Sequence, residues 1–332
     1  MAITFNNRSD DEGEGMKTLM VCWLGFFPLL ILLGCLADTD ERAAGLPDLA
    51  IQANLVFFYY PDLKAAESFY TEMLGLEKVL DYGFAKICRI TQSTYIGLVD
   101  ADRGMHTPDE PKTVTLSFVT DEIDQWYEYL AAQGMEMRGA LSDATRHPTR
   151  GFVTYDPAGY FLEFERFLDH PQNAILHERL KDVASQYPVP GLKTTRPQGL
   201  GIRANVIWLY YRDVPRAQRF YEDVFGASLS VDQGFAKVYG STSSGFIGLV
   251  DETQGLHRFS EAKAVNVAFL TDDIDAWYAR IQEHGLNIRE PLEDAESIPV
   301  RAFVTYDPAG YFLEFDRFLA DPRNDRILRL LK

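Results

Sequence analysis

The stretch FVTYDPAGYFLEF at residues 152–164 recurs letter for letter at residues 303–315. In each copy, two β-prone segments with alternating side chains flank Asp-Pro-Ala-Gly. Proline at the second position and glycine at the fourth are typical of a type I turn. The stretch therefore predicts a β-hairpin that occurs twice in the chain.

The repeat extends well beyond this hairpin. GFAK at residues 83–86 returns at 234–237, and GLVD at 97–100 returns at 248–251, each at the same offset (234 − 83 = 151). A repeat of this length without gaps predicts a duplicated domain rather than short solenoid units. Residues 36–180 contain one complete copy, so we expect them to be able to fold alone.

Each copy shows the order strand, helix, three strands, and then the same order again. In the first copy a β-prone aromatic run at 54–60 ends at Asp62, which is a suitable N-cap for a helix that Gly75 stops. This order predicts an α+β fold. The remaining strands are expected at 79–83, 85–90, 94–99, 114–119, 135–138, 152–155 and 161–167.

Several short motifs occur at matching places in this pattern. They are Asp62-Leu63, Phe69-Tyr70, Leu74-Gly75, and the Asp-Pro-Ala-Gly turn placed just ahead of Glu163. Together they resemble the vicinal oxygen chelate superfamily of glyoxalases, bleomycin-resistance proteins and dioxygenases. The resemblance implies two tandem glyoxalase-like domains. Each would consist of two βαβββ units that form an open curved sheet, a cup for a metal or a small ligand.

The pattern divides the chain into seven segments. They are a mis-assigned start or disordered extension (1–15), a lipoprotein signal peptide (16–34), a tether (35–51), the first glyoxalase-like domain (52–168), a linker (169–202), the second domain (203–319) and a C-terminal helix (320–332).

The N-terminal segment has the organisation of an export signal. From Met16 a single Lys precedes a continuous apolar run, and LLGC at 32–35 resembles the lipobox of bacterial lipoproteins. We therefore expect Cys35 to carry lipid and the protein to be exported and anchored in the bacterial cell envelope, facing the periplasm. An uncleaved membrane anchor is the alternative, although the apolar run is shorter than the ~20 residues of a spanning helix.

The resemblance implies metal ligands on the first, fourth, fifth and eighth strands of a cup, and this sequence supplies few of them. Glu163 and Glu314 fit the eighth-strand position. The first-strand position falls at or beside Asn54 and Asn205, and one carboxylate with neutral oxygens is a poor donor set for zinc, nickel or iron. We predict no bound transition metal and no cofactor, and a hard cation with oxygen ligands is the alternative. The other positions hold Gly97 and Gly248 on the fourth strands, and Thr115 and Asn266 on the fifth.

Glu163 and Glu314 are the first candidates for chemistry. Because side chains alternate along a strand, both should face the cups, where a carboxylate with a raised pKa can act as a general base. The structural alternative is an ion pair with the neighbouring strand, from Arg150 to Glu163 and from Arg301 to Glu314.

Other polar residues recur at the repeat offset. His106 and His257 follow Gly-x in the connection between units and are further catalytic candidates, with a loop residue bonded to backbone carbonyls as the alternative. The candidate ligand-binding residues are Asn54, Lys86, Arg150, Asn205, Lys237 and Arg301.

The formal net charge of −17 disfavours nucleic acid as a partner. We therefore expect a lipid-anchored protein that binds a small, partly apolar molecule without a transition metal. Two alternatives stay open. One is a glyoxalase-like lyase or isomerase, or a dioxygenase-like enzyme, that uses Glu163 or Glu314. The other is a structural lipoprotein without a ligand.

Overall fold

The structure is a computed structural model that describes residues 49–142 and 148–332. Cys35 and the expected signal peptide lie outside the described residues. The elements of the first half are β1 (Ala53–Tyr60), α1 (Leu63–Ser68), the π-helical turn η1 (Phe69–Met73), β2 (Glu77–Asp81), β3 (Ala85–Arg89), β4 (Thr94–Asp100), β5 (Val114–Val119), α2 (Ile123–Ala132), β6 (Thr149–Tyr155), β7 (Phe161–Phe167), the 3-10 turn η2 (Pro171–Asn173) and α3 (Ala174–Leu180).

The second half repeats this order with one additional strand. Its elements are β8 (Ala204–Tyr211), α4 (Val214–Asp223), β9 (Ser228–Asp232), β10 (Ala236–Gly240), β11 (Gly245–Asp251), β12 (Asn266–Leu270), α5 (Ile274–Glu283), β13 (Ile288–Asp294), β14 (Val300–Tyr306), β15 (Phe312–Phe318), η3 (Pro322–Asn324) and α6 (Asp325–Leu330).

The expected α+β class and the duplication of two βαβββ units are confirmed. The strand expected at 135–138 is wrong, because this segment forms only an isolated bridge between Met137 and Thr154. The corresponding segment of the second half pairs along β14 as β13.

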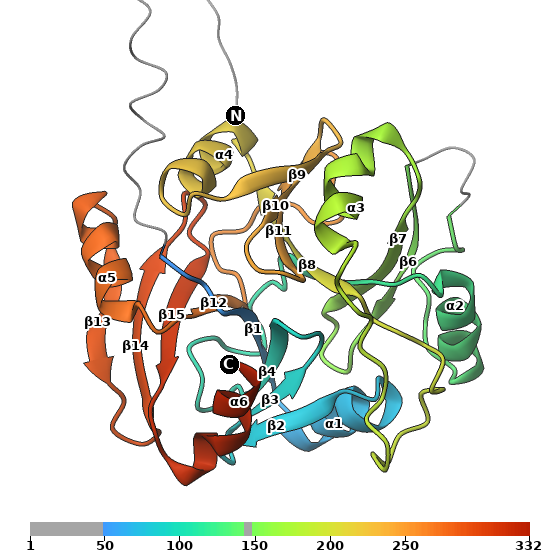
Figure 1. The fold of residues 1–332 in the computed structure, drawn as a ribbon, viewed down its shortest axis with the longest axis horizontal. Helices are drawn as coiled ribbons and strands as arrows, with labels where there is room; N and C mark the ends of the chain where they lie inside the picture. Colours follow the sequence, from blue (N-terminus) through green and yellow to red (C-terminus); the bar gives the residue numbers. More distant parts are fainter. Residues whose placement is uncertain (1–48, 143–147) are drawn as a thin grey trace, which may run out of the picture. The chain divides into compact units, whose positions relative to one another are not determined.

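The two sheets are assembled across the halves. One sheet has eight strands in the order β13-β14-β15-β12-β1-β4-β3-β2, and the other has seven in the order β6-β7-β5-β8-β11-β10-β9. Antiparallel pairing of β1 with β12, and of β5 with β8, joins the first unit of one half to the second unit of the other. Figure 1 shows the consequence, since β1 lies beside β12 although the two are far apart in sequence. Each half therefore contributes strands to both sheets and contains neither sheet complete, so the folding of residues 36–180 alone stays a prediction.

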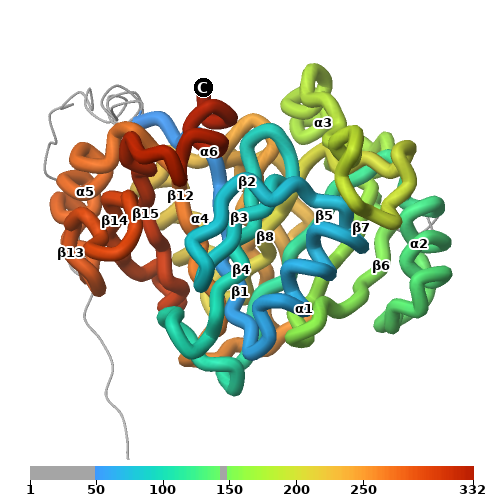
Figure 2. The backbone as a smooth tube through the Cα atoms, turned by 90° about the horizontal axis from the view of Figure 1, so that it is seen from below, coloured from blue at the N-terminus to red at the C-terminus, as the bar shows by residue number. Residues whose placement is uncertain are grey.

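The helices cover one face of each sheet. In the eight-stranded sheet α1 packs on β4 and α5 packs on β13, β14 and β15, while α2 and α4 pack on the seven-stranded sheet. In Figure 2, α5 and α2 lie at opposite ends of the molecule. The other face of each sheet is free of these four helices. We call that face of the eight-stranded sheet cup A and that face of the seven-stranded sheet cup B.

Within one half, helices and the repeated hairpin hold the two units together. The Tyr129 hydroxyl of α2 donates to the carbonyl of Met73 at 2.7 Å. Asp156 of the hairpin accepts hydrogen bonds from the hydroxyls of Tyr60 at 2.6 Å and Tyr70 at 3.1 Å. Since Tyr60 belongs to the other sheet, the Asp-Pro-Ala-Gly turn links the two sheets as well as reversing the chain. The expected cap is also confirmed, because Asp62 accepts from the backbone of Ala65.

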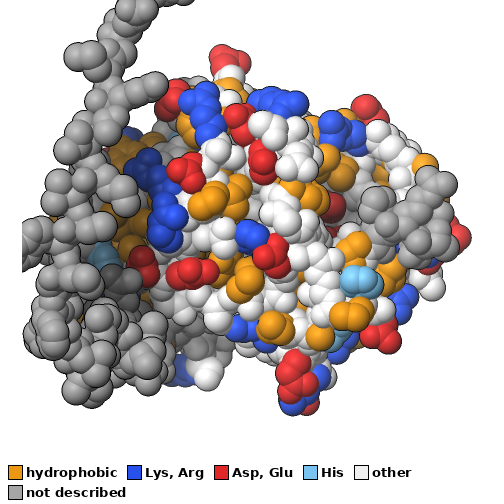
Figure 3. Space-filling view, turned by 90° about the horizontal axis from the view of Figure 1, so that it is seen from above, with side chains coloured by type: hydrophobic (Ala, Val, Ile, Leu, Met, Phe, Trp, Pro, Cys, Tyr) orange, Lys and Arg blue, Asp and Glu red, His pale blue; other side chains and the backbone are white. Residues whose placement is uncertain are grey.

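The outer surface carries both signs of charge. In the view of Figure 3, Lys and Arg side chains alternate with Asp and Glu over the visible face. Among the residues that the structure describes, no helix is both long and apolar enough to span a membrane.

Candidate functional site

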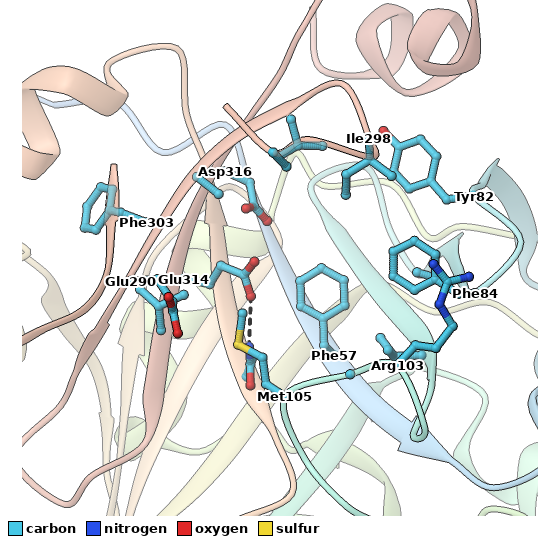
Figure 4. Close-up of a pocket in the computed structure, with 18 of the residues that line it drawn as sticks. Phe57, Tyr82, Phe84, Arg103, Met105, Glu290, Ile298, Phe303, Glu314 and Asp316 are labelled. Carbon is cyan, nitrogen blue, oxygen red and sulfur yellow. Dashed lines mark hydrogen bonds between the residues drawn. The ribbon is translucent and has the colours of Figure 1, made fainter. Parts of the chain in front are cut away.

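Cup A contains a cavity of ≈ 340 Å³ between the two halves. Aromatic side chains from β1 and the β2–β3 hairpin form one wall, and β14 and β15 form the other (Figure 4). Glu314 and Asp316 project from β15 toward the same space (Figure 4). Volumes of this order are typical of sites for small organic molecules.

Four residues face cup A at one level of the sheet. Phe57 of β1 is paired with Gly97 of β4 on one side and with Asn266 of β12 on the other. Asn266 in turn donates a hydrogen bond to Glu314 at 2.9 Å. Gly97, Asn266 and Glu314 stand at the fourth-, fifth- and eighth-strand positions at which the family resemblance implies metal ligands.

The residues at these positions do not fit a transition metal. A Cβ atom built on Gly97 would lie 2.2 Å from the ring of Phe57, so the aromatic ring occupies the space of a fourth-strand ligand. Cup B has the same arrangement, with a Cβ on Gly248 lying 2.0 Å from the ring of Trp208. Zinc, nickel and iron require imidazole, thiolate or several carboxylates. No group of three or more His, Cys, Asp or Glu side chains suited to a metal occurs in the described part of the chain.

The two asparagines of the first strands do not face the cups. Asn54 and Asn205 are buried, and they donate to the Ser241 hydroxyl at 2.5 Å and to the Ser117 carbonyl at 2.7 Å, respectively. Phe57 lies three positions after Asn54, and an odd offset along a strand places two side chains on opposite faces. Phe57 and Trp208, not the asparagines, therefore face the cups.

A second carboxyl group accompanies Glu314 in cup A. Burial raises the pKa of Glu314, and the hydrogen bond from Asn266 partly opposes this. Burial together with the charge and hydrogen bond of Glu314 raises the pKa of Asp316 well above its usual range. Sequence reasoning missed Asp316 and its counterpart Glu165, although the alternation that placed Glu314 and Glu163 in the cups applies equally two residues later.

A chain of hydrogen bonds connects Glu314 to the connection between units. Asn266 joins Glu314 to His106, since its Oδ1 lies 3.0 Å from Nε2 of His106. The other ring nitrogen of His106 is 2.6 Å from Glu110. Both ring nitrogens of His106 are therefore hydrogen-bonded. Burial would raise the pKa of Glu110, but hydrogen bonds from Thr107 and His106 outweigh it and lower the pKa.

Cup B holds the same scaffold, and two pairs of its polar side chains are bonded to each other. Ser117 donates a hydrogen bond to Glu165, and Thr115 is 2.7 Å from the Tyr210 hydroxyl. Burial raises the pKa of Glu165 to about 7 and, with the charge of Glu165, raises the pKa of Glu163 well above its usual range. Burial and the charge of Arg138 lower the pKa of His257 to about 4, which makes it a neutral ring at physiological pH.

The remaining basic candidates lie away from the cups. Arg150 bonds to Asp124 at 2.6 and 2.8 Å, and Arg301 bonds to Asp275 and Asp294 at 3.0 Å. The expected Arg–Glu pairs are therefore wrong, because Arg150 lies opposite Arg166 in the register of β6 and β7 and so on the other face from Glu163.

The two lysines are engaged in surface ion pairs. Lys86 contacts Asp81 at 2.7 Å and Glu67 at 3.4 Å, and Lys237 contacts Asp232 at 2.6 Å. The structure thus connects Glu314 to His106 through Asn266. The candidate arginines, lysines and first-strand asparagines do not face the cups.

The family is shown by comparison with known proteins. The model of the Glyoxalase/Bleomycin resistance protein/Dioxygenase superfamily matches residues 52–164 and 203–315. The chain belongs to this superfamily. Both matches fall on the two expected glyoxalase-like domains, so the tandem organisation is confirmed. No curated protein matches the sequence.

Solved structures of the superfamily share the fold at low identity. A candidate dioxygenase from Bacillus subtilis subsp. subtilis str. 168 is 14% identical with a TM-score of 0.59, over 84% of this chain and 88% of that one. Glyoxalase I from Zea mays is 16% identical with a TM-score of 0.54, over 83% of this chain and 94% of that one. Identities at this level show the fold, not the activity.

Proposed function

We propose that the protein binds a small, partly apolar molecule in cup A, without a transition metal. The observation that carries this proposal is the cavity of ≈ 340 Å³, which has aromatic walls and carboxyl groups on one side. A concave apolar pocket with a few polar groups is the usual form of a small-molecule site. In cup B, by contrast, Trp208 replaces Phe57, and Ser117 and Thr115 are bonded to neighbours.

Calorimetric titration with 4-phenylbutanol tests this function. This neutral probe has an aromatic body and one polar end, as the cavity requires. Ala85 lines the cavity, and Ala236 is its counterpart in cup B. Ala85→Leu should weaken binding at least ~10-fold because it fills the cavity, whereas Ala236→Leu should leave binding unchanged. If wild type does not bind the probe, or if both variants bind like wild type, cup A is not the site.

Metal independence is tested by elemental analysis after dialysis against a mild chelator. We expect less than roughly one transition metal per chain. In cup A the four positions hold one carboxylate and one amide beside Phe57 and Gly97, and cup B holds the counterparts of these residues. Finding one or two equivalents that Glu163→Gln or Glu314→Gln removes would replace the binding function with a metalloenzyme.

Acid–base catalysis is a second candidate function, favoured by one observation. Glu314 is joined through Asn266 and His106 to Glu110, an arrangement that can hold or relay a proton. Glyoxalase I and the candidate dioxygenase are relatives of this chain, so a lyase, isomerase or dioxygenase-like activity is the enzymatic alternative. A structural lipoprotein without a ligand is the outcome if neither binding nor turnover is found.

We further propose that Cys35 anchors the protein to the cell envelope. The lipobox-like LLGC at residues 32–35 supports this assignment. Metabolic labelling with a radioactive fatty acid should mark wild type, and Cys35→Ala should lose the label and accumulate as uncut precursor. Labelling of the variant, or a cytosolic wild type, would contradict the anchor.

A further inference from the structure

Asp316 has a buried carboxyl oxygen without a partner. Its side chain is 3% exposed and lines cup A, and its Oδ1 accepts no hydrogen bond from any described residue. In cup B the equivalent Glu165 accepts a hydrogen bond from Ser117. The residue that matches Ser117 is Ala268, which has no side-chain donor. A buried oxygen that accepts no hydrogen bond lowers the stability of the folded protein. A ligand that brings a hydrogen-bond donor would satisfy it.

The charge inside the cavity has one predominant sign. The described lining residues include four acidic side chains, Glu290, Glu293, Glu314 and Asp316, and one basic side chain, Arg103. Arg103 lies over Phe84, with its guanidinium carbon 4.3 Å from the ring centroid, and not against the carboxyl groups (Figure 4). Glu290 is paired with Arg289 at 3.7 Å, whereas Glu314 and Asp316 have no salt bridge with a described residue.

The wall opposite the carboxyl groups is aromatic. Phe57, Tyr59 and Phe84 present ring surfaces to the same space. Aromatic faces attract cations, and the contact of Arg103 with Phe84 shows that this wall already holds one. An anionic ligand would be repelled by the carboxyl groups on one wall and by the electron-rich faces of the aromatic rings on the other.

We propose that cup A binds an organic cation, an amine or related ammonium group on an apolar body. The cationic group donates to Asp316 and Glu314, and the body packs against Phe57 and Phe84. This assignment rests on the proposed binding function and specifies its ligand class.

Binding of this ligand is coupled to ionisation of the carboxyl pair. Burial raises the pKa values of Glu314 and Asp316, and the charge of Glu314 raises that of Asp316 further, so a bound ammonium group displaces a proton from the pair. The other titratable or charged groups that face the pair or its cavity are Glu290, Glu293, Arg103, Tyr59 and Tyr82, with Arg289 beside Glu290 and Tyr59 and with His106 behind Asn266. Affinity for an amine should therefore increase with pH as the pair loses its proton, while affinity for a neutral analogue should stay constant.

The test compares three probes of one shape, 4-phenylbutylamine, 4-phenylbutanol and 4-phenylbutyrate, by calorimetric titration at pH 7.5. Wild type should bind the amine at least ~10-fold more tightly than the alcohol, and the alcohol more tightly than the butyrate. Asp316→Asn should remove most of this preference, because it should weaken binding of the amine far more than binding of the alcohol. Ala268→Ser should also reduce the preference, because the new hydroxyl supplies the missing donor. Glu165→Gln in cup B is the matched control and should keep the preference.

The outcomes separate this inference from the function it rests on. If the alcohol binds wild type and the amine binds no better, the site is a neutral apolar cup and the organic cation is excluded. If the preference survives in Asp316→Asn, the carboxyl pair does not recognise the cation and the assignment is wrong. If none of the three probes binds, the proposed binding function fails together with this inference.

Discussion

Cups A and B are built from the same repeated scaffold, yet they differ in which polar groups have hydrogen-bond partners. In cup B the indole of Trp208 lies over Gly248, and Ser117 donates to Glu165. In cup A the smaller ring of Phe57 lies over Gly97, and Ala268 leaves Asp316 without a donor. A few substitutions on one face of a sheet are therefore enough to change which polar groups of a cup have partners. The strand order and the helix packing stay the same.

The histidines of the two connections differ in the same sense. Both rings lie between a tyrosine and a phenylalanine, Tyr59 and Phe312 for His106, and Tyr210 and Phe161 for His257. His106 bonds to Glu110 and Asn266, whereas Nε2 of His257 has no hydrogen-bond partner among the described residues. Position 266 decides this difference, because its counterpart Thr115 bonds to Tyr210 instead.

The largest expected effect comes from separating the halves. Residues 36–202 keep the linker, whose Arg196 donates to the carbonyls of Leu74 and Leu200, but they lack β8 and β12 as partners for β5 and β1. We expect no folded monomer, because each cup would lose half of its sheet and expose strand edges. Light scattering with circular dichroism should find a dimer, in which two copies pair β1 with β5, or aggregate. A cooperatively unfolding monomer would contradict the cross-half assembly.

The next largest effect concerns the packing of an aromatic ring on a glycine in each cup. Gly97→Ala and Gly248→Ala each place a Cβ atom inside an aromatic ring, 2.2 Å from Phe57 and 2.0 Å from Trp208. We expect each to lower the free energy of unfolding by about 2–3 kcal/mol, with the larger cost at Trp208 because the indole has less room to move. Urea unfolding measures both. Adding Phe57→Leu to Gly97→Ala should recover part of the loss, and no recovery would show that the ring is not the obstacle.

The sequence predicted the scaffold better than the site. Strand alternation placed Glu163 and Glu314 in the cups correctly, because the period of two holds along any regular strand. The same rule places Arg150 on the opposite face, but applying it requires the register of β6 against β7, which the sequence leaves open. The pairing of β1 with β12 is not readable either, because both halves offer equivalent apolar edges. The unpartnered oxygen of Asp316 depends on Ala268 in a neighbouring strand, so it emerges only from the three-dimensional arrangement.

A smaller effect distinguishes the two histidines. His106→Phe removes the bonds to Glu110 and Asn266 and leaves both groups without their partner. His257→Phe keeps the packing and removes an unpartnered nitrogen, at the cost of a backbone contact with Val114. We expect the first variant to be less stable than the second by about 1–2 kcal/mol in urea unfolding. Equal losses would indicate that the connection of cup A is no more organised than that of cup B.

The smallest effect is on the pH dependence of stability, and its sign follows from the buried carboxyl groups. Burial raises the pKa of Glu165 from 4.5 to about 7 and the pKa of Asp156 and Asp307 from 3.8 to about 6. The folded protein then holds protons that the unfolded chain has released, so stability should fall as pH rises from about 4 to 7. At the acid end, burial would raise the pKa of Asp81, but bonds from Lys78, Lys86 and Gly83 lower it to about 2, so its contribution is lost only below pH 4. Urea midpoints should therefore be highest near pH 4–5.

Glu165→Gln isolates one of these groups. The amide oxygen of glutamine can still accept from Ser117, so the change removes the titration and keeps the hydrogen bond. Between pH 5 and pH 8 the variant should lose less stability than wild type, because it has no carboxyl group at this position to ionise. Glu293→Gln, at an exposed position of β13, is the control and should follow the wild-type curve. A urea midpoint that rises from pH 5 to pH 8 in wild type would mean that the carboxyl groups of the cups ionise with little loss of stability. Cup B would then be as available to a ligand as cup A.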